Sequence, residues 1–400
     1  MPQTYRYVII GGGLTGAHAV AGIRECDADG SILLIGDEPH LPYDRPDLSK
    51  KLWFGKKQVP EVFVHDEAYY EDQGVDVRLG ERIVGLDARQ KMVIDGEGKA
   101  YMYRQLLLAT GGAPRKLDVP GGDLEGLYYY RYLGDYLALR AETAAGKSAV
   151  VIGGGFIGSE MAAALNLNQV EVALLIRGKH LVPQVFPESL SLALQKQYGE
   201  RGVRVLTEDS PASIERTGDR FVVETQGGAR LEADMVVIGI GIAPAIELAE
   251  KAGADVENGV IVNECLETSH ADVYAAGDNA FFPYQALGIR TRIEHWDHAI
   301  NQGKQAGRNM AGANEAYTYM PFFFSDLFDF GYEAVGAVDS RLQVFADWQK
   351  ENDTGVLYYL DQGKVRGAMM CNVWDKVPEA RELILKGETV TPDDLRGAIK

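Results

Sequence analysis

The sequence predicts an α/β protein with two Rossmann-like domains and a small α+β C-terminal domain. Three observations carry this prediction. A glycine-rich turn occurs twice, about 142 residues apart, each time between an apolar strand-like run and an alanine-rich helical stretch. The length of 400 residues is more than one domain of ~100–200 residues needs. From Met320 onward, short strand-like runs replace the alternation of strands and helices.

The first glycine turn follows the apolar run Tyr7–Ile10, and its residues Gly11–Gly16 fit the pattern Gly-x-Gly-x-x-Gly. In such a turn the first glycine allows a tight bend, the second lets a pyrophosphate approach the backbone, and the third lets the helix pack closely. The next strand, Ile32–Ile35, ends at Asp37 and Glu38, about 21 residues after the turn, where a carboxylate accepts hydrogen bonds from an adenosine ribose. The alternatives are a glycine-rich turn without a ligand and a solvated loop after the second strand.

The second glycine turn repeats this pattern with a different continuation. Residues Ala149–Ile152 predict a strand, Gly153–Gly158 form the turn, and Val170–Leu175 predict the next strand. No acid follows that strand, but Arg177 and Lys179 do. Because a 2′-phosphate needs cationic partners, these residues favour NADPH over NADH. The alternative is that both cations lie in a solvated loop.

Two further segments end a strand at a glycine. The apolar run Leu106–Leu108 leads into Ala109–Gly112, and Val273–Asp278 ends in a Gly-Asp pair. An aspartate in that place accepts a hydrogen bond from a ribityl hydroxyl, and its glycine neighbour lets the backbone come close. Two nucleotide folds in one chain predict two dinucleotides that exchange a hydride, with FAD in the first and a nicotinamide in the second.

The composition excludes several classes of function. With 40 Lys and Arg against 58 Asp and Glu, the formal net charge of −18 argues against a nucleic-acid partner. Cys26, Cys265 and Cys371 are too far apart for a dithiol relay or a zinc site. His295 and His298 have no further His or Cys cluster beside them, so no metal is expected. No apolar run reaches the ~20 residues of a membrane span, and we expect a soluble cytoplasmic protein.

At these and further residues the chain resembles the two-dinucleotide flavoprotein reductases, and within them the branch of ferredoxin/rubredoxin reductases and apoptosis-inducing factor. The resemblance covers nearly the whole chain and rests on the strings Gly11–Gly16, Leu41–Lys50, Ala109–Arg115, Gly153–Glu160, Ala275–Asp278 and Glu294–Ala299. Met320–Leu327 and Gly331–Gly336 look most like the C-terminal domain of apoptosis-inducing factor. The implied fold is glutathione-reductase-like. An FAD domain (1–115 and 245–318) is interrupted by an NAD(P) domain (116–244), and a C-terminal α+β interface domain (319–400) covers the flavin.

The resemblance also implies which residues form the site. Lys50 and Glu160 look like the catalytic pair beside flavin N5, where a cation stabilises electron density arriving on the ring and a carboxylate positions that cation. Beyond the turn residues Gly11, Gly13 and Gly16, the FAD contacts would be Asp37, Glu38, Arg45, Lys50, Asp278, His295 and Trp296. The nicotinamide contacts would be Gly154, Gly155, Phe156, Ile157, Glu160, Gly241, Glu294 and Glu333. The other predicted cofactor contacts are Leu14, Thr15, Ile83, Ala109, Thr110, Gly111, Arg177, Lys179 and Phe324.

The chain departs from the family pattern in three places. No cysteine occurs near residues 40–52, so disulfide-reductase chemistry is not expected. The usual acid for NADH is absent near Gly178, and either nicotinamide remains open. We expect neither the long C-terminal insertion nor the mitochondrial targeting segment of the metazoan death factor, and therefore no role in cell death.

Three functions follow as hypotheses. The leading one is an NAD(P)H-dependent FAD reductase that passes electrons to a ferredoxin or rubredoxin. The second is a diaphorase that reduces quinones or oxygen. The third is a redox sensor similar to apoptosis-inducing factor, with slow turnover, a lasting charge-transfer complex and a change in homodimer or partner binding. An acidic carrier needs a local basic patch on this acidic chain. Such a patch is formed by these cations unless neighbouring acids balance them: Lys50, Lys51, Lys56, Lys57, Arg290, Arg292, Lys304 and Arg308.

Overall fold

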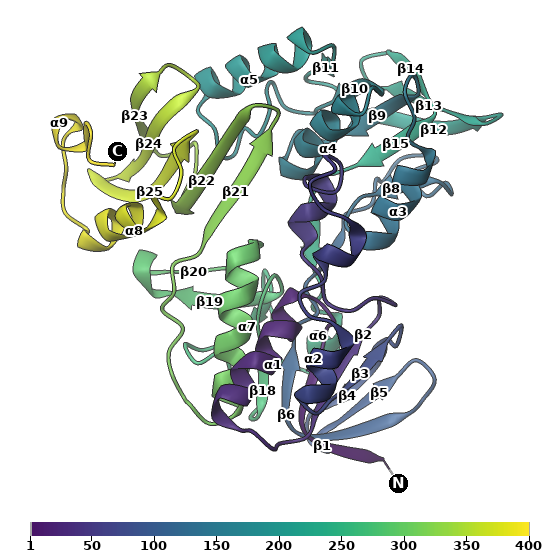
Figure 1. The fold of residues 1–400 in the computed structure, drawn as a ribbon, viewed down its shortest axis with the longest axis vertical. Coiled ribbons are helices and arrows are strands. Elements are labelled where there is room, and N and C mark those ends of the chain that lie inside the picture. Colours follow the sequence, from purple (N-terminus) through teal and green to yellow (C-terminus); the bar gives the residue numbers. More distant parts are fainter. Residues whose placement is uncertain (1, 400) are drawn as a thin grey trace. The chain divides into compact units, whose positions relative to one another are not determined.

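The computed structural model describes residues 2–399 (Figure 1), and the described chain divides into two compact units. The first unit comprises the chain up to Asp44, Val59–Ala113 and Ala243–Pro321. The second comprises Arg45–Gln58, Pro114–Ile242 and the chain from Phe322 onward. The strands β7 (Gly112–Pro114) and β16 (Ile242–Pro244) pair with each other where the chain passes from one unit to the other. Among the described helices, none is long and apolar enough to cross a membrane.

The first unit is built on a seven-stranded sheet of order β3-β2-β1-β6-β5-β4, with β18 pairing on β6. The pairs among β1, β2, β3, β6 and β18 are parallel, whereas β4 and β5 continue the sheet as antiparallel strands. The strands are β1 (Gln3–Ile10), β2 (Ile32–Gly36), β3 (Val75–Leu79), β4 (Ile83–Asp87), β5 (Met92–Asp95), β6 (Ala100–Leu108) and β18 (Val273–Ala275). The apolar runs of β1, β2 and β6 are buried on both faces, as parallel strands between helices require, and Ile9, Leu34 and Leu107 have no exposed surface.

Helices α1 (Leu14–Cys26) and α7 (Trp296–Met310) pack backbone against backbone in the first unit. A Cβ atom at Gly22 would lie 2.0 Å from the carbonyl oxygen of Lys304, and one at Gly303 would lie 2.4 Å from that of Thr15. This close approach fixes the start of α7 relative to the first glycine turn. The unit also contains α2 (Glu67–Asp72), α6 (Glu247–Lys251), η2 (Val59–Val62), η3 (Gln285–Leu287) and a small sheet of β17 (Val260–Ile261), β19 (Ala280–Tyr284) and β20 (Ile289–Thr291).

The second unit contains a five-stranded parallel sheet of order β11-β10-β9-β15-β8. An antiparallel sheet of β12, β13 and β14 covers it, and Val150 and Val236 of the first sheet share an apolar core with Phe221 and Val223 of the second. The strands are β8 (Leu127–Tyr129), β9 (Ser148–Ile152), β10 (Glu171–Leu175), β11 (Arg204–Leu206), β12 (Pro211–Thr217), β13 (Arg220–Thr225), β14 (Arg230–Ala233) and β15 (Met235–Ile238). The helices are η1 (Arg45–Ser49), α3 (Leu133–Glu142), α4 (Phe156–Leu167) and α5 (Glu188–Glu200).

The C-terminal part of the second unit is an antiparallel sheet of order β21-β22-β25-β24-β23. Its strands are β21 (Phe322–Leu327), β22 (Phe330–Gly336), β23 (Gln343–Lys350), β24 (Thr354–Asp361) and β25 (Lys364–Cys371), followed by α8 (Val377–Lys386) and α9 (Pro392–Leu395). Helix α8 buries Val377, Ala380 and Ile384 and packs on β22 and β25.

The predicted fold class is confirmed, because the described chain has two sheets with parallel strands flanked by helices and a separate antiparallel α+β part. Two groupings differ from the predicted limits. The chain from Phe322 onward, predicted as a domain of its own, belongs to the same unit as Pro114–Ile242. Residues Arg45–Gln58, expected with the first domain, belong to the second unit. The buried side chains of Leu48, Leu52 and Trp53 anchor this segment there. The assignment of a particular nucleotide to each domain stays a prediction.

Candidate active site

The first glycine turn has the geometry of a phosphate cradle. Gly11 has a φ of +125°, and a Cβ atom there would lie 2.1 Å from the carbonyl oxygen of Ala109 at the end of β6. A Cβ atom at Gly16 would lie 2.2 Å from the carbonyl oxygen of Gly11. Gly13 caps α1, and a Cβ atom there would meet nothing within 4 Å. Two glycines therefore allow close packing and the third leaves space before the helix N-terminus, where Leu14 and Thr15 begin a helix whose first N–H groups lack intrahelical acceptors.

The second glycine turn has the same division of roles. Gly153 has a φ of +119° and closes on the carbonyl oxygen of Gly239, 2.3 Å from a Cβ atom placed there. A Cβ atom at Gly158 would lie 1.9 Å from the carbonyl oxygen of Gly153. Gly154 packs against the side chain of Ile176, whereas Gly155 caps α4 with open space in front of it. Both cradles thus fit the phosphates of a dinucleotide.

The two acids after β2 have different surroundings. Asp37 is exposed, whereas Glu38 is partly buried and its Oε2 accepts a hydrogen bond of 2.6 Å from the hydroxyl of Tyr43. Tyr43 is buried and therefore holds the Glu38 carboxylate at the carboxyl end of β2. Ile83 begins β4 of the same sheet with 7% of its surface exposed, where it contributes apolar packing.

The end of β6 and the Gly-Asp segment after β18 are joined by a buried amide. The Asn279 Nδ2 donates to the carbonyl oxygen of Leu108 at 3.0 Å and to the Thr110 Oγ1 at 2.9 Å. Asn279 has no exposed surface, and its Oδ1 has no hydrogen-bond partner in the described chain. Gln302 of α7 accepts the Gly277 N–H at 2.7 Å, which fixes the backbone beside Asp278. Ala109, Thr110 and Gly111 are thereby held next to the first glycine turn.

Helix α7 begins directly after Glu294 and His295. Burial lowers the pKa of His295 to about 4, against the opposing effect of Asp278, so the imidazole is neutral near pH 7. The Trp296 Nε1 donates to the Asp44 Oδ1 at 2.7 Å. Glu294 is exposed and pairs with Arg292 at 2.5 Å. The neutral imidazole and the fixed indole lie at the N-terminus of α7, which carries a partial positive charge.

A buried ion pair occupies the second unit. The Lys50 Nζ lies 2.7 Å from the Glu160 Oε1, and the side chains are 8% and 3% exposed. Two serine hydroxyls also donate to this carboxylate, Ser325 to Oε1 and Ser49 to Oε2, each at 2.5 Å. With three donors the carboxylate is well compensated for the loss of water. The ammonium lies 5.5 Å from the centre of the Phe324 ring, within the range of a cation–π contact.

The side chains around this ion pair are mostly aromatic and buried. Tyr198 and Tyr332 are fully buried, and burial together with the Glu160 carboxylate raises the pKa of both phenols. Burial also raises the pKa of Asp326, against the effect of Lys50. Phe156, the first residue of α4, contacts Phe323 with 5.8 Å between ring centres. The low polarity strengthens the attraction between Lys50 and Glu160.

The remaining predicted nicotinamide residues are spread over the second unit. Ile157 is 38% exposed at the start of α4, and Gly241 has a φ of +93° with open space around it. Glu333 of β22 accepts the Asp375 N–H at 3.1 Å, and burial raises the pKa of its carboxyl group. Arg45 also lies in this unit, where it donates to the Arg131 carbonyl oxygen at 3.1 Å.

Arg177 and Lys179 follow β10 at the carboxyl edge of the parallel sheet. Both are exposed, and neither forms an ion pair with another described residue. The adjoining loop is tied to the second glycine turn because the Val182 N–H donates to the Gly154 carbonyl oxygen at 2.8 Å. These cations are therefore available to a polyanionic ligand on the side of the sheet where the turn lies.

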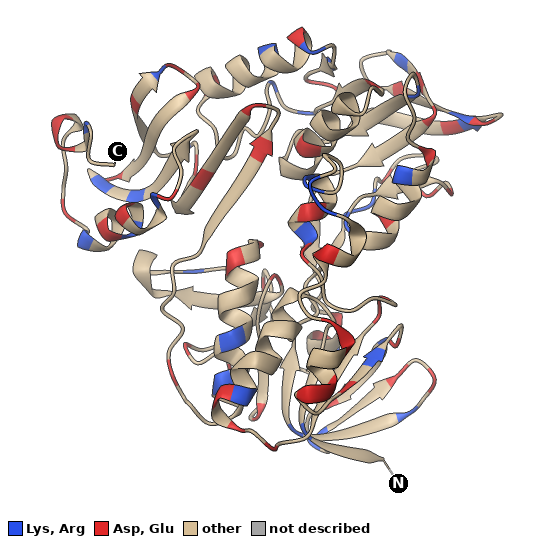
Figure 2. Cartoon of the chain, in the orientation of Figure 1, with Lys and Arg blue, Asp and Glu red and all other residues tan. Residues whose placement is uncertain are grey.

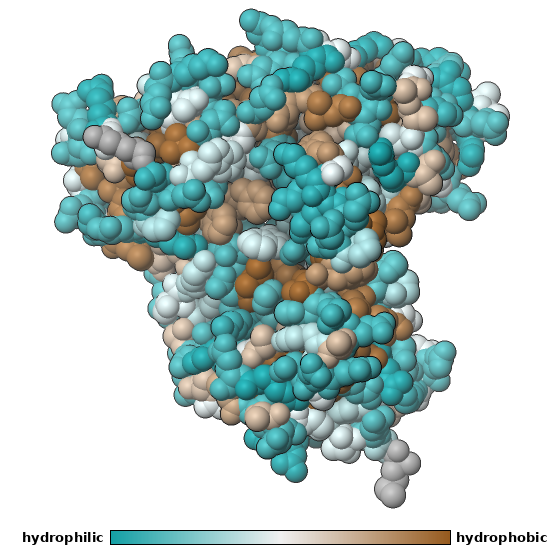
Figure 3. Space-filling model, viewed as in Figure 1, coloured by the Kyte–Doolittle hydropathy of each residue, from teal (hydrophilic) through white to brown (hydrophobic). Residues whose placement is uncertain are grey.

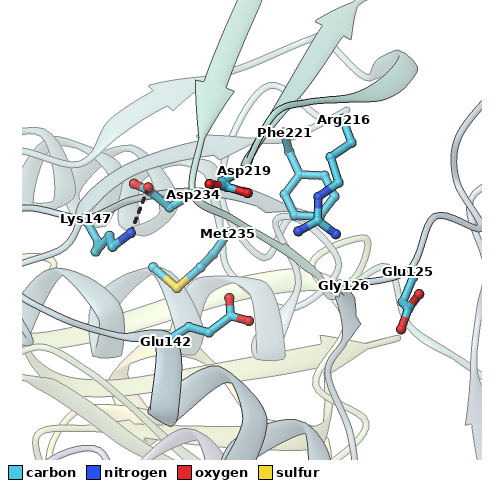
Figure 4. A pocket seen from close by; sticks show the side chains of 9 residues that line it. All are labelled: Glu125, Gly126, Glu142, Lys147, Arg216, Asp219, Phe221, Asp234 and Met235. Atoms are coloured by element: carbon cyan, nitrogen blue, oxygen red, sulfur yellow. Dashed lines mark hydrogen bonds and ion pairs between the residues drawn. The ribbon is translucent and has the colours of Figure 1, made fainter.

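The second unit has a cavity of about 550 Å³ away from this edge (Figure 4). Lys147, which precedes β9, and Asp234, which precedes β15, form part of its lining, and they pair at 3.1 Å. The cavity thus lies at the amino ends of these parallel strands, whereas ligands of open α/β sheets bind at the carboxyl ends. It is not the nucleotide site. No group of His, Cys, Asp and Glu in residues 2–399 has the arrangement of a metal site.

Sequence reasoning missed four polar residues that organise these sites, namely Ser49, Ser325, Asn279 and Gln302. Ser49 precedes Lys50, and Asn279 follows Asp278, so their positions next to predicted site residues were a usable signal. Ser325 likewise follows the predicted contact Phe324, whereas Gln302 has no such signal, because its contact forms only through the fold.

The family model named pyridine nucleotide-disulphide oxidoreductase matches residues 5–303. The chain belongs to this family. A second model, the C-terminal domain of mitochondrion-associated apoptosis-inducing factor, matches residues 306–354. The resemblance inferred from the sequence motifs is confirmed.

Relatives of the chain include reductases and an apoptosis-inducing factor. It is 33% identical over 394 residues to the ferredoxin–NAD(+) reductase component of an anthranilate 1,2-dioxygenase system from Burkholderia cepacia, covering 97% of this chain and 96% of that protein. It is 32% identical to apoptosis-inducing factor 1, mitochondrial, from Dictyostelium discoideum, covering 97% of this chain and 80% of that protein. A solved covalent complex of putidaredoxin reductase with putidaredoxin contains a chain with a TM-score of 0.92 and 29% identity, covering 97% of this chain and 95% of that one.

This member of the pyridine nucleotide-disulphide oxidoreductase family has three free cysteines. Cys26 is exposed, Cys265 is partly buried and Cys371 is buried. Cys26 lies in α1, Cys265 lies in a turn between β17 and β18, and Cys371 ends β25. Burial raises the pKa of the Cys371 thiol and thereby keeps it protonated.

Proposed function

We propose that the chain is an FAD-dependent NAD(P)H oxidoreductase that delivers electrons to an external carrier of the ferredoxin or rubredoxin type. The observation that carries this proposal is the pair of equivalent glycine cradles in one chain. Gly13 and Gly155 each precede a helix N-terminus, and each has open space beside its Cα atom. The 33% identity to a ferredoxin–NAD(+) reductase component over nearly the full length of both chains supports it.

The first unit supplies the FAD contacts in this proposal. Gly11, Gly13 and Gly16, with Leu14 and Thr15, form the pyrophosphate cradle, and the carboxylates Asp37 and Glu38 follow β2 for the adenosine ribose. The Asp278 carboxylate accepts from the ribityl chain, with Ala109, Thr110, Gly111 and Ile83 as neighbouring contacts. The neutral His295 and Trp296 start α7, whose dipole favours negative charge at that end.

The second unit supplies the nicotinamide contacts and the charge beside the ring. Gly154, Gly155, Phe156 and Ile157 form the pyrophosphate cradle, with Gly241, Phe324 and Glu333 as further contacts. In the same proposal, Glu294 is a nicotinamide contact and Arg45 is an FAD contact. Glu160 holds the Lys50 ammonium in one position, so the cation need not reorganise as charge develops next to it. When bound, FAD takes a hydride from NAD(P)H and passes the two electrons on singly, so that one NAD(P)H reduces two one-electron carriers and releases one proton.

The choice of nicotinamide and the location are part of the same proposal. The unpaired, exposed cations Arg177 and Lys179 favour the 2′-phosphate of NADPH. A cytoplasmic location suits the exposed free thiol of Cys26.

A second candidate function is redox sensing with slow turnover. The match of residues 306–354 to the C-terminal domain of apoptosis-inducing factor favours it. The two functions differ in the lifetime of the reduced protein in the presence of a carrier.

The experiment is steady-state reduction of a plant-type [2Fe–2S] ferredoxin by the purified protein with NADPH or NADH, after the bound flavin has been identified by release and chromatography. We expect FAD at one per chain and carrier reduction that stops when Lys50 is replaced by Met. A protein without flavin, or carrier reduction unchanged in Lys50→Met, would contradict the proposal.

A further inference from the structure

The segment Arg45–Gln58 is strongly basic in an acidic chain. It contains five cations and one acid, a net of +4 within a protein of net charge −18. Figure 2 shows this segment as blue stretches beside α4, and η1 of the segment contacts that helix. Hydrophilic residues gather over it in the space-filling view (Figure 3). Such a local reversal of charge is the kind of feature that steers an oppositely charged partner.

Part of this charge is neutralised within the second unit. Lys50 is buried against Glu160, and Lys57 pairs with the buried Asp47 at 2.7 Å. Lys51 lies 3.8 Å from Asp47 and is 53% exposed. Lys56 is exposed and forms no ion pair with a described residue, its Nζ lying 5.9 Å from the Phe54 ring centre.

A further cation belongs to the same surface. Arg140 of α3 is exposed, stacks over the Trp53 ring at 5.4 Å and donates to Asn168 at 2.8 Å. Asn168 in turn donates to the Trp53 carbonyl oxygen at 3.2 Å. We call Lys51, Lys56, Lys57 and Arg140 the basic surface. Trp53 is 3% exposed and fixes the backbone that carries its lysines.

The other four cations of the predicted patch have partners within the first unit. In the first unit, Lys304 pairs with Glu25 at 2.6 Å, and Arg308 pairs with both Glu25 and Glu315. Arg292 is paired with Glu294. Arg290 donates to two backbone carbonyl oxygens at 2.6 and 2.9 Å. Acids or backbone carbonyl groups therefore hold these four cations, whereas Lys51, Lys56 and Arg140 of the basic surface are exposed.

We propose that the basic surface is the docking site of an acidic electron-carrier protein, held by carboxylates that face Lys51, Lys56 and Arg140. This inference rests on the proposed function, because Lys51 directly follows the lysine assigned to the flavin. The rest of the chain repels an acidic carrier, so the attraction is short-ranged and sets the orientation of docking. Phe54 is half-buried among the lysines and adds an apolar contact at the centre.

The test compares two double variants with the same change in net charge. Lys51→Gln/Lys56→Gln alters the basic surface. Lys196→Gln/Lys350→Gln is the control, because both lysines are exposed in the second unit and each pairs with a nearby acid. Binding of oxidised plant-type [2Fe–2S] ferredoxin to the flavin-loaded protein is measured by calorimetry at low ionic strength and again at about 0.15 M salt, where the Debye length is ~8 Å.

We expect the basic-surface variant to raise the Kd about fivefold at low ionic strength, with a smaller effect at higher salt, and the control to change it less than about 1.5-fold. Equal Kd values for the two variants, or no binding of ferredoxin to the unaltered protein, would overturn the proposal. A short DNA duplex that binds with the same dependence on Lys51 and Lys56 would also overturn it in favour of a nucleic acid.

Two additional readouts separate this proposal from the proposed function. Flavin reduction by NADPH and reduction of the neutral quinone menadione do not require protein docking, and we expect both to be unchanged in the basic-surface variant. If the unaltered protein fails in these two reactions, the proposed function fails. If the unaltered protein carries out both reactions and ferredoxin binding does not depend on Lys51 and Lys56, only the proposed docking site is wrong.

Discussion

Replacing Glu160 by Gln removes the negative charge from the buried pair while keeping the size of the side chain. The Lys50 side chain is 8% exposed, so its ammonium group would stay buried without a counter-charge. Breaking a buried pair in this way costs about 3–5 kcal/mol. The amide oxygen of Gln still accepts one hydrogen bond, so we expect the lower value, a loss of about 3 kcal/mol in the free energy of unfolding. For a unit of ~150–250 residues, in which 1 kcal/mol shifts Tm by ~2–4 °C, the second unit should melt about 6–12 °C lower.

The assay is scanning calorimetry of the flavin-loaded protein within a double-mutant cycle. Lys50→Met alone leaves Glu160 with the donors Ser49 and Ser325 but without its cation, and should destabilise the second unit similarly. The double variant Lys50→Met/Glu160→Gln buries no uncompensated charge, so its loss should be smaller than the sum of the single losses by about 2 kcal/mol or more. Additive losses, or a Glu160→Gln protein within about 1 kcal/mol of the parent, would refute this account of the pair.

Three further predictions concern the cradles and a buried imidazole. The Cβ atom of Gly155→Ala meets open space, so this variant should keep its melting temperature and raise the Kd of the nicotinamide nucleotide about tenfold. The Cβ atom of Gly158→Ala would lie 1.9 Å from a carbonyl oxygen, so this variant should not fold. Calorimetry and nucleotide titration check both outcomes. Replacing Arg177 and Lys179 by Gln should raise the KM for NADPH about tenfold and that for NADH less than twofold, and equal changes would remove their assignment to the 2′-phosphate. Burial lowers the pKa of His298 to about 3, below its value in the unfolded chain. The stability that this difference contributes is therefore complete above pH ~6.5 and is lost as the pH falls toward the folded pKa. Denaturant titrations should show that the free energy of unfolding falls by about 2–3 kcal/mol from pH 6.5 to 4.5, and that His298→Phe reduces this loss.

The two glycine cradles were predictable because their requirements are local. A positive φ at Gly11 and Gly153, and a close approach to the helix at Gly16 and Gly158, demand glycine at fixed spacing within six residues. The strand before each turn and the helix after it follow from apolar runs of the right length. Local sequence therefore places both nucleotide cradles before any tertiary contact is known.

The surroundings of Glu160 were not predictable in the same way. Ser49 and Ser325 are 111 and 165 residues away in the chain, and a serine has no spacing rule that assigns it to a distant carboxylate. The grouping of Arg45–Gln58 with the second unit likewise depends on Trp53, which packs edge-on against Tyr136 and donates to Tyr130 at 3.0 Å. Such contacts are properties of the fold, because they join elements that the sequence separates.

The ion-pair partners of the candidate cations were also not predictable from the sequence. The sequence provides eight cations as candidates for a basic patch, but it does not say that Glu25 faces both Lys304 and Arg308 from another helix. The structure shows that Lys304 and Arg308 are paired with an acid, whereas Lys51 and Lys56 are exposed. An interpretation from net charge alone would have treated them as equal.

The most direct test of the central claim is anaerobic stopped-flow absorbance of the purified protein mixed with NADPH or NADH, followed by a second mixing with oxidised ferredoxin. The account predicts rapid bleaching of the flavin band, faster with NADPH, and rapid return of the band when ferredoxin arrives. A protein that binds no flavin, or a flavin band that neither nucleotide bleaches, would contradict it. A reduced protein whose long-wavelength band persists in the presence of ferredoxin would contradict the reductase function and support redox sensing.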